Sequence, residues 1–194
     1  MSGTGRLALV VGHMAISGGA QGKPPINASE YIYNTDLAKT IKQCGESRGH
    51  RVDIFFRDIG GIPWAYRQVK NQASDACIEL HFNASNGTVQ GTETWYLDLD
   101  KNSNIMEADF AKIVQKNICT LFERVGNTDR GVKVPAREDR GYQNLSQLRD
   151  IPVILIEPFF GDNAADAVMA VEKKQALAET IIASFEEWLA LKNP

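Results

Sequence analysis

Residues 7–13 read Leu-Ala-Leu-Val-Val-Gly-His, an unbroken apolar run that ends beside a histidine. Two later apolar runs have the same form and end on His81 and on Glu157. Such runs are typical of strands buried on both faces, as in a largely parallel sheet covered by helices. Because ligands of these sheets lie beyond the carboxyl ends of the strands, we expect His13, His81 and Glu157 to converge if the three strands are neighbours.

The rest of the chain alternates predicted strands with predicted helices, which indicates an α/β fold. We predict strands at residues 7–12, 52–56, 77–81, 92–98 and 153–157, and helices at residues 30–48, 63–74, 105–125 and 165–191. Residues 127–150 are polar and show little periodicity, so we expect an irregular surface excursion near the site. Helical spacing predicts that the last helix packs inward through Val168, Val171, Ala178, Ile182, Phe185 and Leu189.

The composition narrows the class of protein. The chain has 194 residues and a formal net charge of −3, without the clustered Lys and Arg of a nucleic-acid-binding surface. No apolar run is long enough to span a membrane, and residues 1–6 lead into the first strand without a secretory signal. We therefore expect one domain, residues 1–194, with neither nucleic acid nor a membrane as its partner. It is either made in the cytoplasm as it stands or is a fragment of a larger protein. The three cysteines fall in predicted helices or strands, which favours buried free thiols.

Glu30 allows two interpretations. It ends the segment Asn27-Ala28-Ser29-Glu30, which matches a capping box in which the glutamate bonds back to the cap. It also lies on the apolar stripe of the predicted helix at 30–48, where an ionised carboxylate is costly unless a cation or hydrogen bonds compensate it. The second interpretation makes Glu30 a candidate member of the site.

Three polar residues, Glu79, His81 and Asn83, alternate along the third predicted strand and so share one face of it. Burying polar groups without partners is costly, which favours a functional use of that face. Glu157 lies between apolar residues and Pro158-Phe159-Phe160. Its alternatives are an ion pair with a Lys or Arg at the end of the sheet, or a general base whose pKa is raised by apolar surroundings.

Together these candidates supply two imidazoles and two carboxylates. Two histidines and one carboxylate are a common zinc set in hydrolases, with a fourth position open for water. The remaining carboxylate would be the base, and we interpret the chain as a hydrolase. No short motif such as His-Glu-x-x-His fixes the set.

The order of the motifs along the chain is that of a known family. They are Gly12-His13, Gly19-Ala20, Glu30 with Asn34, residues 75–84 (Asp-Ala-Cys-Ile-Glu-Leu-His-Phe-Asn-Ala), Gly91-Thr92-Glu93, Arg130-Gly131-Val132-Lys133 and residues 155–163 (Leu-Ile-Glu-Pro-Phe-Phe-Gly-Asp-Asn). From residue 7 to residue 185 the chain resembles the zinc-dependent N-acetylmuramoyl-L-alanine amidases of the type 3 family. The resemblance implies a single α/β domain of the phosphorylase/hydrolase-like kind, with a twisted, mostly parallel but mixed sheet flanked by helices. It also implies hydrolysis of the amide between N-acetylmuramic acid and L-alanine in peptidoglycan.

The resemblance assigns roles to individual residues. It implies that His13, Glu30 and His81 hold Zn²⁺ and that Glu157 is the catalytic glutamate. Glu79 departs from the family, because many members carry a small hydroxyl residue at this position. This additional acid could support a ligand, contact the substrate or act as an alternative ligand.

Other polar residues are candidates for contact with the peptidoglycan substrate. They comprise the ligand-face residues Glu79 and Asn83 together with Arg130, Lys133, Asn144 and Arg149. The last four lie in or beside the irregular stretch and could bind carboxylates of the stem peptide. As loop residues they could equally be solvated surface groups.

Two further inferences concern the biological setting and the alternatives. The chain shows neither a signal peptide nor an appended wall-binding module, so it resembles a phage or prophage endolysin that lyses the cell wall more than a secreted autolysin. A zinc carboxypeptidase or another small-amide hydrolase could use the same His and Glu set. A non-catalytic peptidoglycan-binding protein or phage structural protein would instead have neither metal nor turnover.

Overall fold

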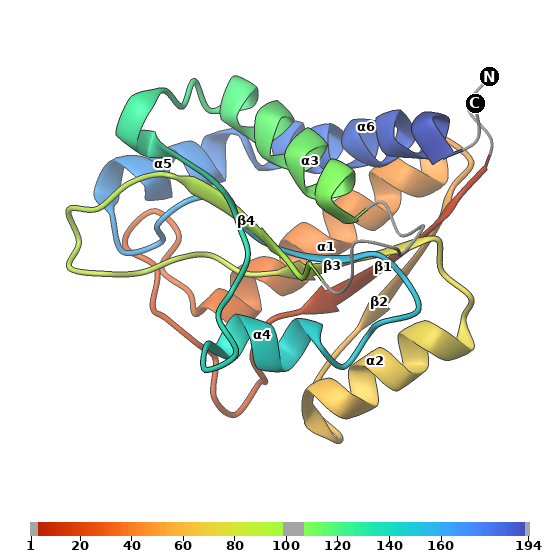
Figure 1. The fold of residues 1–194 in the computed structure, drawn as a ribbon. Helices are drawn as coiled ribbons and strands as arrows, with labels where there is room; N and C mark the ends of the chain where they lie inside the picture. Colours follow the sequence, from red (N-terminus) through yellow and green to blue (C-terminus); the bar gives the residue numbers. More distant parts are fainter. Residues whose placement is uncertain (1–3, 99–106, 193–194) are drawn as a thin grey trace.

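The computed structural model describes residues 4–98 and 107–192, which fold around a six-stranded sheet (Figure 1). The strands lie in the order β2-β1-β3-β6-β4-β5. All neighbouring pairs are parallel except β4 and β6, which are antiparallel. This arrangement confirms the mixed, mostly parallel sheet. The strands are β1 Arg6–Val11, β2 Arg51–Phe55, β3 Ala76–Leu80, β4 Thr92–Tyr96, β5 Asp129–Lys133 and β6 Val153–Glu157.

Helices cover both faces of the sheet (Figure 1). The described helices are α1 Glu30–Ser47, α2 Gly61–Asn71, α3 Glu107–Leu121, α4 Arg140–Leu145, α5 Ala164–Glu172 and α6 Lys174–Lys192, with a 3-10 turn at Gly126–Thr128. Helices α1, α3 and α6 form one layer, and their core includes Leu9 and Ile78 of the sheet. Helices α2 and α4 lie on the opposite face, where the core includes Val10 and Cys77.

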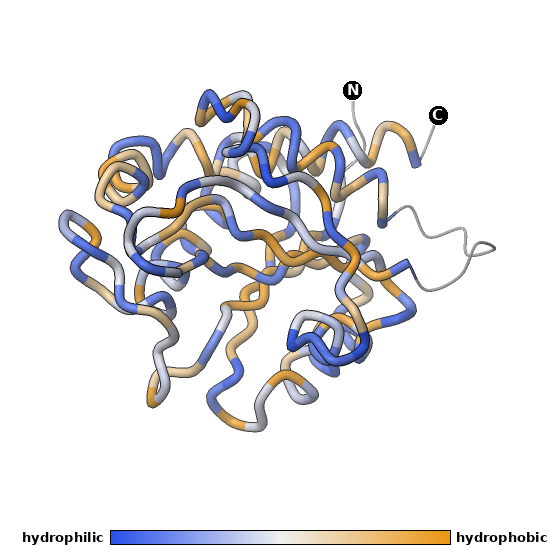
Figure 2. Tube along the Cα trace, turned by 60° about the vertical axis from the view of Figure 1, so that its left-hand side comes forward, coloured by the Kyte–Doolittle hydropathy of each residue, from blue (hydrophilic) through white to orange (hydrophobic). Residues whose placement is uncertain are grey.

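This layering explains the unbroken apolar runs. Successive residues of a strand point to opposite faces, and here both faces are covered, so every position of β1 from Leu7 to Val11 is buried. Figure 2 shows the corresponding apolar segments running through the middle of the molecule. All three cysteines are free and buried, as expected. Within the described part of the chain, no helix combines the length and apolar character needed to cross a membrane.

The topology brings together the three strands that carry the candidate site. β3 lies between β1 and β6, and the register pairs Val11 with Leu80 and Leu80 with Ile156. All three strands are parallel, so they end at the same edge of the sheet. The expectation that they are neighbours is confirmed.

Residues 127–150, expected to be irregular, contain the strand β5 and the helix α4. β5 is an edge strand paired with β4, and none of its residues is buried, so it shows no alternation of apolar and polar residues. α4 has six residues, of which only Leu145 is buried. Both elements are too short and too polar to show a periodic pattern in the sequence.

The last predicted helix, 165–191, is in fact two helices, α5 and α6, which are separated at Lys173. Val168 and Val171 were expected inward but are each 41% exposed. Ala167 and Ala170 are the buried apolar residues of α5, and alanine gives a weaker apolar signal than valine. The predicted helix at 105–125 ends at Leu121, and its first two residues lie outside the described ranges.

Trp188 should contribute strongly to stability. Its side chain is fully buried, with its ring centroid 5.1 Å from that of Phe110 and 6.1 Å from that of Phe185. We expect Trp188→Ala to lower the free energy of unfolding by about 3–5 kcal/mol, because it leaves a cavity between α3 and α6. Leu191→Ala, at a position 53% exposed on the same helix, should change it by less than about 0.5 kcal/mol. Urea unfolding monitored by circular dichroism measures both, and equal effects would contradict this packing.

Candidate metal centre

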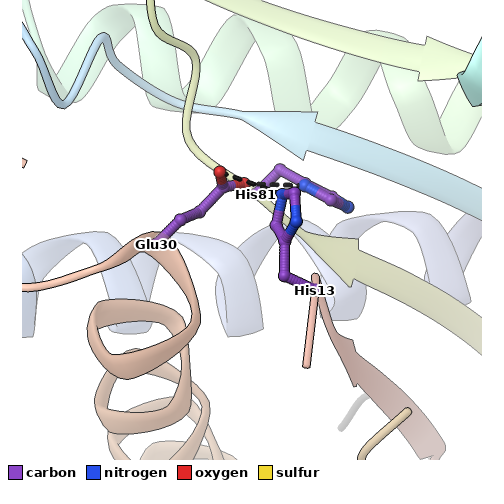
Figure 3. A group of neighbouring side chains, drawn as sticks. All are labelled: His13, Glu30 and His81. Atoms are coloured by element: carbon purple, nitrogen blue, oxygen red, sulfur yellow. Dashed lines mark hydrogen bonds and ion pairs between the residues drawn. The ribbon is translucent and has the colours of Figure 1, made fainter. Parts of the chain in front are cut away.

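Three side chains meet at the carboxyl edge of the sheet (Figure 3). His13 follows β1, His81 follows β3, and Glu30 begins α1. Their candidate ligand atoms all lie within 4.8 Å of one another. The His13 Nε2 atom is 3.0 Å from Glu30 Oε2, and the His81 Nδ1 atom is 2.7 Å from Glu30 Oε1. The structure therefore brings together the three residues proposed as ligands.

The Glu30 side chain is almost fully buried, and its environment stabilises the ionised carboxylate. Backbone N–H groups donate to it from Phe82 at 3.1 Å and from Ala20 at 3.3 Å. Burial alone would raise the pKa of Glu30, but hydrogen bonds from His13 and His81 outweigh burial and lower it to about 2. The carboxylate also lies at the amino terminus of α1, where the helix dipole favours negative charge.

The capping-box interpretation of Glu30 is wrong. Ser29 is the N-cap of α1, and its side chain accepts a hydrogen bond from the Ile32 N–H. Glu30 is the first residue of the helix, and its carboxylate points to the two histidines instead of to the cap (Figure 3).

Close backbone approach makes room for the cluster. Gly19 has φ +79, and a Cβ atom there would lie 2.7 Å from both Glu30 Oε2 and His13 Nε2. A Cβ atom on Gly12 would lie 2.5 Å from the His81 ring. His13 itself adopts a left-handed backbone conformation with φ 64, which is uncommon for a residue with a side chain. The sequence Gly12-His13 and the glycine at 19 are thus local requirements of this geometry.

The donor set fits a divalent transition metal. It offers two imidazole nitrogens and one carboxylate oxygen, the set in which zinc hydrolases leave a fourth position open. The cluster gathers a buried anionic oxygen with two ring nitrogens, which is a chemical arrangement suited to a cation. Among the residues that the structure describes, this is the group of His, Cys, Asp and Glu side chains that could hold a metal ion.

Glu157 ends β6 beside a second carboxylate, Glu93, with which it is paired across the antiparallel strands β4 and β6. Two side chains donate to both carboxylates. Asn83 Nδ2 lies 3.0 Å from Glu157 Oε2 and 3.1 Å from Glu93 Oε1. Trp95 Nε1 lies 3.3 Å and 3.2 Å from the same two oxygens.

The cations near this pair contact Glu93, not Glu157. Arg130 Nε and Lys133 Nζ lie 2.5 and 2.6 Å from Glu93 Oε2. Burial would raise the pKa of Glu93, but hydrogen bonds from the Glu157 carboxyl and from the two cations lower it. Burial, followed by the hydrogen bond with Glu93, raises the pKa of Glu157 to about 8. Arg130 and Lys133 thus pair with Glu93, and within the described part of the chain Glu157 interacts with that carboxylate instead of with a Lys or Arg of its own.

A cleft of about 600 Å³ opens beside these groups. One wall of the cleft is formed by the segment that contains α4, a helix that was not predicted from the sequence. The cleft is lined by His13, Arg57, His81, Trp95, Asp139, Arg140, Gly141, Gln143, Asn144, Leu155 and Glu157. It therefore joins two of the candidate ligands to the candidate base.

The remaining predicted residues are distributed unevenly. Asn144 lines the cleft, and its Nδ2 donates to Glu79 at 2.9 Å. Glu79 is buried behind His81, which contacts it through Nε2 at 2.8 Å. Arg149 does not line the cleft, and its Nε donates to the Ser146 carbonyl oxygen at 3.0 Å. Contacts of these residues with a substrate stay predictions.

Arg57, Trp95 and Arg140 line the cleft but were not identified from the sequence. Arg57 comes two residues after β2, so the rule that found His13 and His81 at strand ends could have found it. Trp95 lies on the same face of β4 as Glu93, a relation that alternation indicates once Glu93 is suspected. Arg140 begins the short helix α4, and no signal in the sequence marks it.

Gly19 provides a test of the geometry. We expect Gly19→Ala to weaken metal binding strongly, because the new Cβ atom would displace Glu30 and His13. Gly131→Ala is the matched control, since φ is +77 there but no atom lies within 4 Å of the position that the added methyl group would take. Both changes place a Cβ atom on a left-handed backbone, at a similar cost of about 1–2 kcal/mol. Isothermal titration with zinc, compared with melting temperature, separates the two effects; equal metal affinity in both variants would contradict the arrangement.

Comparison with known proteins places the chain among enzymes of one kind. The family model described as N-acetylmuramoyl-L-alanine amidase matches residues 7–187. An uncharacterised cell wall amidase of Bacillus anthracis is 29% identical over 91% of this chain and 34% of the relative, so the chain spans about a third of that protein.

Two solved structures are similar to this chain over nearly all of its length. Cwp6 from Clostridium difficile is 26% identical with a TM-score of 0.80, covering 96% of this chain and 30% of that one. The catalytic domain of the CD27L endolysin, which targets Clostridia difficile, is 25% identical with a TM-score of 0.72, covering 93% and 96%. On the match over residues 7–187, this chain belongs to the N-acetylmuramoyl-L-alanine amidase family.

Proposed function

We propose that residues 1–194 form one catalytic domain that hydrolyses the amide between N-acetylmuramic acid and L-alanine in peptidoglycan, with Zn²⁺ held by His13, Glu30 and His81. The observation that carries this proposal is the convergence of these three side chains, two of which line the same cleft as Glu157. Membership of the amidase family supports the choice of bond.

The three ligands would hold zinc through His13 Nε2, His81 Nδ1 and the Glu30 carboxylate. When bound, zinc supplies a Lewis acid that polarises a carbonyl and lowers the pKa of water toward about 7. Glu30 contributes a carboxylate that is already negatively charged, since its pKa is lowered to about 2. The two rings are held at a centroid distance of 5.1 Å in an edge-to-face arrangement, which preorganises the nitrogens.

Glu157 is suited to move the proton. Its pKa, raised to about 8 by burial and by the bond to Glu93, makes it a stronger base than an exposed glutamate. We propose that its carboxylate accepts a proton from the attacking water and returns it to the L-alanine nitrogen as the C–N bond breaks. Asn83 and Trp95, which donate to Oε2, would hold that carboxylate in one orientation.

Several residues near the cleft are proposed to bind the stem peptide. Asn144 lines the wall, and Lys133 lies 4.9 Å from the ring centroid of the lining residue Trp95. Arg130 is paired with Glu93 like Lys133, so its first role would be to fix the charge of that carboxylate. Arg149 would contact only a part of the substrate that extends beyond the cleft.

The same proposal sets the place of action at the bacterial cell wall. Similarity to the catalytic domain of an endolysin supports a role in lysis. A carboxypeptidase with the same ligands remains distinguishable by its products.

Glu157→Gln should abolish turnover while the metal is retained. The amide is nearly isosteric but cannot accept the proton, so we expect a loss of at least about 100-fold in rate, with about one zinc per chain retained by elemental analysis. His81→Ala should lose both zinc and activity. Glu172→Gln, an exposed position on α5, is the control and should lose neither. Near-wild-type turnover of Glu157→Gln would assign the base to another residue.

The products identify the bond. Digestion of purified peptidoglycan should expose new amino termini on L-alanine and release peptides without sugar, while the number of reducing ends stays constant. Amino-terminal labelling and mass spectrometry measure these outcomes. Free single amino acids from the end of the stem would indicate a carboxypeptidase, and disaccharide attached to every released peptide would refute the amidase assignment.

A further inference from the structure

Glu79 lies behind His81 and is completely buried. Four side chains donate to its carboxylate. His81 Nε2 at 2.8 Å, Asn144 Nδ2 at 2.9 Å and Arg57 Nη2 contact Oε1, and the Tyr66 hydroxyl contacts Oε2 at 2.5 Å. These donors come from α2, α4 and the segments after β2 and β3. A single carboxylate therefore joins the sheet edge to the two helices on one of its faces.

The two ring nitrogens of His81 face different carboxylates. Nδ1 is 2.7 Å from Glu30, a fellow member of the candidate ligand cluster, whereas Nε2 is 2.8 Å from Glu79. If Nδ1 binds the metal, Nε2 carries the proton and donates it to Glu79. Such a partner fixes the tautomer and the orientation of a metal-binding histidine. This geometry makes Glu79 a support for a ligand and not an alternative ligand.

The buried charge of Glu79 is paired with Arg57, whose Nη2 atom also lies 3.3 Å from His81 Nε2. A fully buried carboxylate is costly unless it is paired and hydrogen-bonded, and the Arg57 side chain, which is 11% exposed, supplies the opposite charge. Burial lowers the pKa of Arg57.

We propose that Glu79 is the positioning residue for His81, and that the Oε1 atom it shares with Asn144 connects the α4 wall of the cleft to the metal centre. This inference rests on the proposed zinc site but not on the identity of the bond that is cleaved. It requires the acceptor oxygen at position 79. The negative charge is needed only to balance Arg57.

The test separates the role of the acceptor oxygen at position 79 from the role of the negative charge there. Glu79→Gln alone would leave the Arg57 cation buried without a counter-charge, which could unfold the chain. The comparison is therefore made between Arg57→Met/Glu79→Gln and Arg57→Met/Glu79→Leu. Both double variants lack the ion pair, and the side chains at position 79 are similar in size. Only glutamine offers an oxygen to His81 Nε2. Circular dichroism and melting temperature confirm that each variant is folded.

Zinc affinity is the primary measurement, made by competition with a chromophoric chelator at fixed pH. We expect the leucine double variant to bind zinc about 10–100-fold more weakly than the glutamine double variant. The visible absorption of the cobalt-loaded protein should change in the leucine variant alone. Tyr66→Phe removes a donor to Oε2 without touching His81, so it should leave zinc affinity and the cobalt spectrum close to those of the wild type.

A second measurement needs no variant. Nitrogen NMR of the zinc-loaded wild-type protein should show His81 with metal on Nδ1 and a proton on Nε2. The opposite assignment would overturn the proposal even if the leucine variant fails to fold. Equal zinc affinity in the two folded double variants would also overturn it. A wild-type chain that binds no zinc would refute the metal centre and this inference together. A chain that binds zinc but leaves the muramoyl–alanine bond intact would refute only the proposed substrate.

Discussion

The buried carboxylate of Glu30 is the interaction on which the site depends. It joins His13, which follows β1, to His81, which follows β3, and it does so from the first turn of α1. Because two backbone N–H groups and two imidazoles surround it, the carboxylate stays ionised despite burial. The left-handed conformations of His13 and Gly19 follow from the need to bring these groups into contact.

The sequence predicted the layers of the fold well because they depend on long apolar runs. β1, β3 and β6 are buried on both faces, and that burial leaves a continuous signal. The elements that were missed, β5 and α4, have little buried surface and so no periodicity. The break between α5 and α6 was missed for a different reason: apolar residues continue at helical spacing across Lys173, although one helix ends at Glu172 and the next begins at Lys174.

The candidate site likewise contains residues that could be predicted from the sequence and residues that could not. Residues placed by the end of a parallel strand, such as His13 and His81, could be predicted because strand ends gather at one edge. Glu93 lies beside Glu157 because the antiparallel register of β4 and β6 pairs the two residues. No local sequence pattern predicts that register. The wall of the cleft formed by α4 could not be predicted either. This helix has only six residues, and it contacts the site through the hydrogen bond from Asn144 to Glu79.

Two glutamates of this site, Glu30 and Glu157, have pKa values that are shifted in opposite directions. Burial alone would raise the pKa of both Glu30 and Glu157. The partners of each carboxylate decide the direction of the shift, so the pKa of Glu30 is lowered and that of Glu157 is raised. Glu30 faces two imidazoles and remains an anion, which suits a metal ligand. Glu157 faces Glu93, whose negative charge is stabilised by Arg130 and Lys133, so the pKa of Glu157 is raised whereas that of Glu93 is lowered. Among the residues that the structure describes, the fold places the cations on Glu93 and leaves Glu157 without a cation of its own, and this separation is what the proposed division of roles requires, with Glu30 as metal ligand and Glu157 as base.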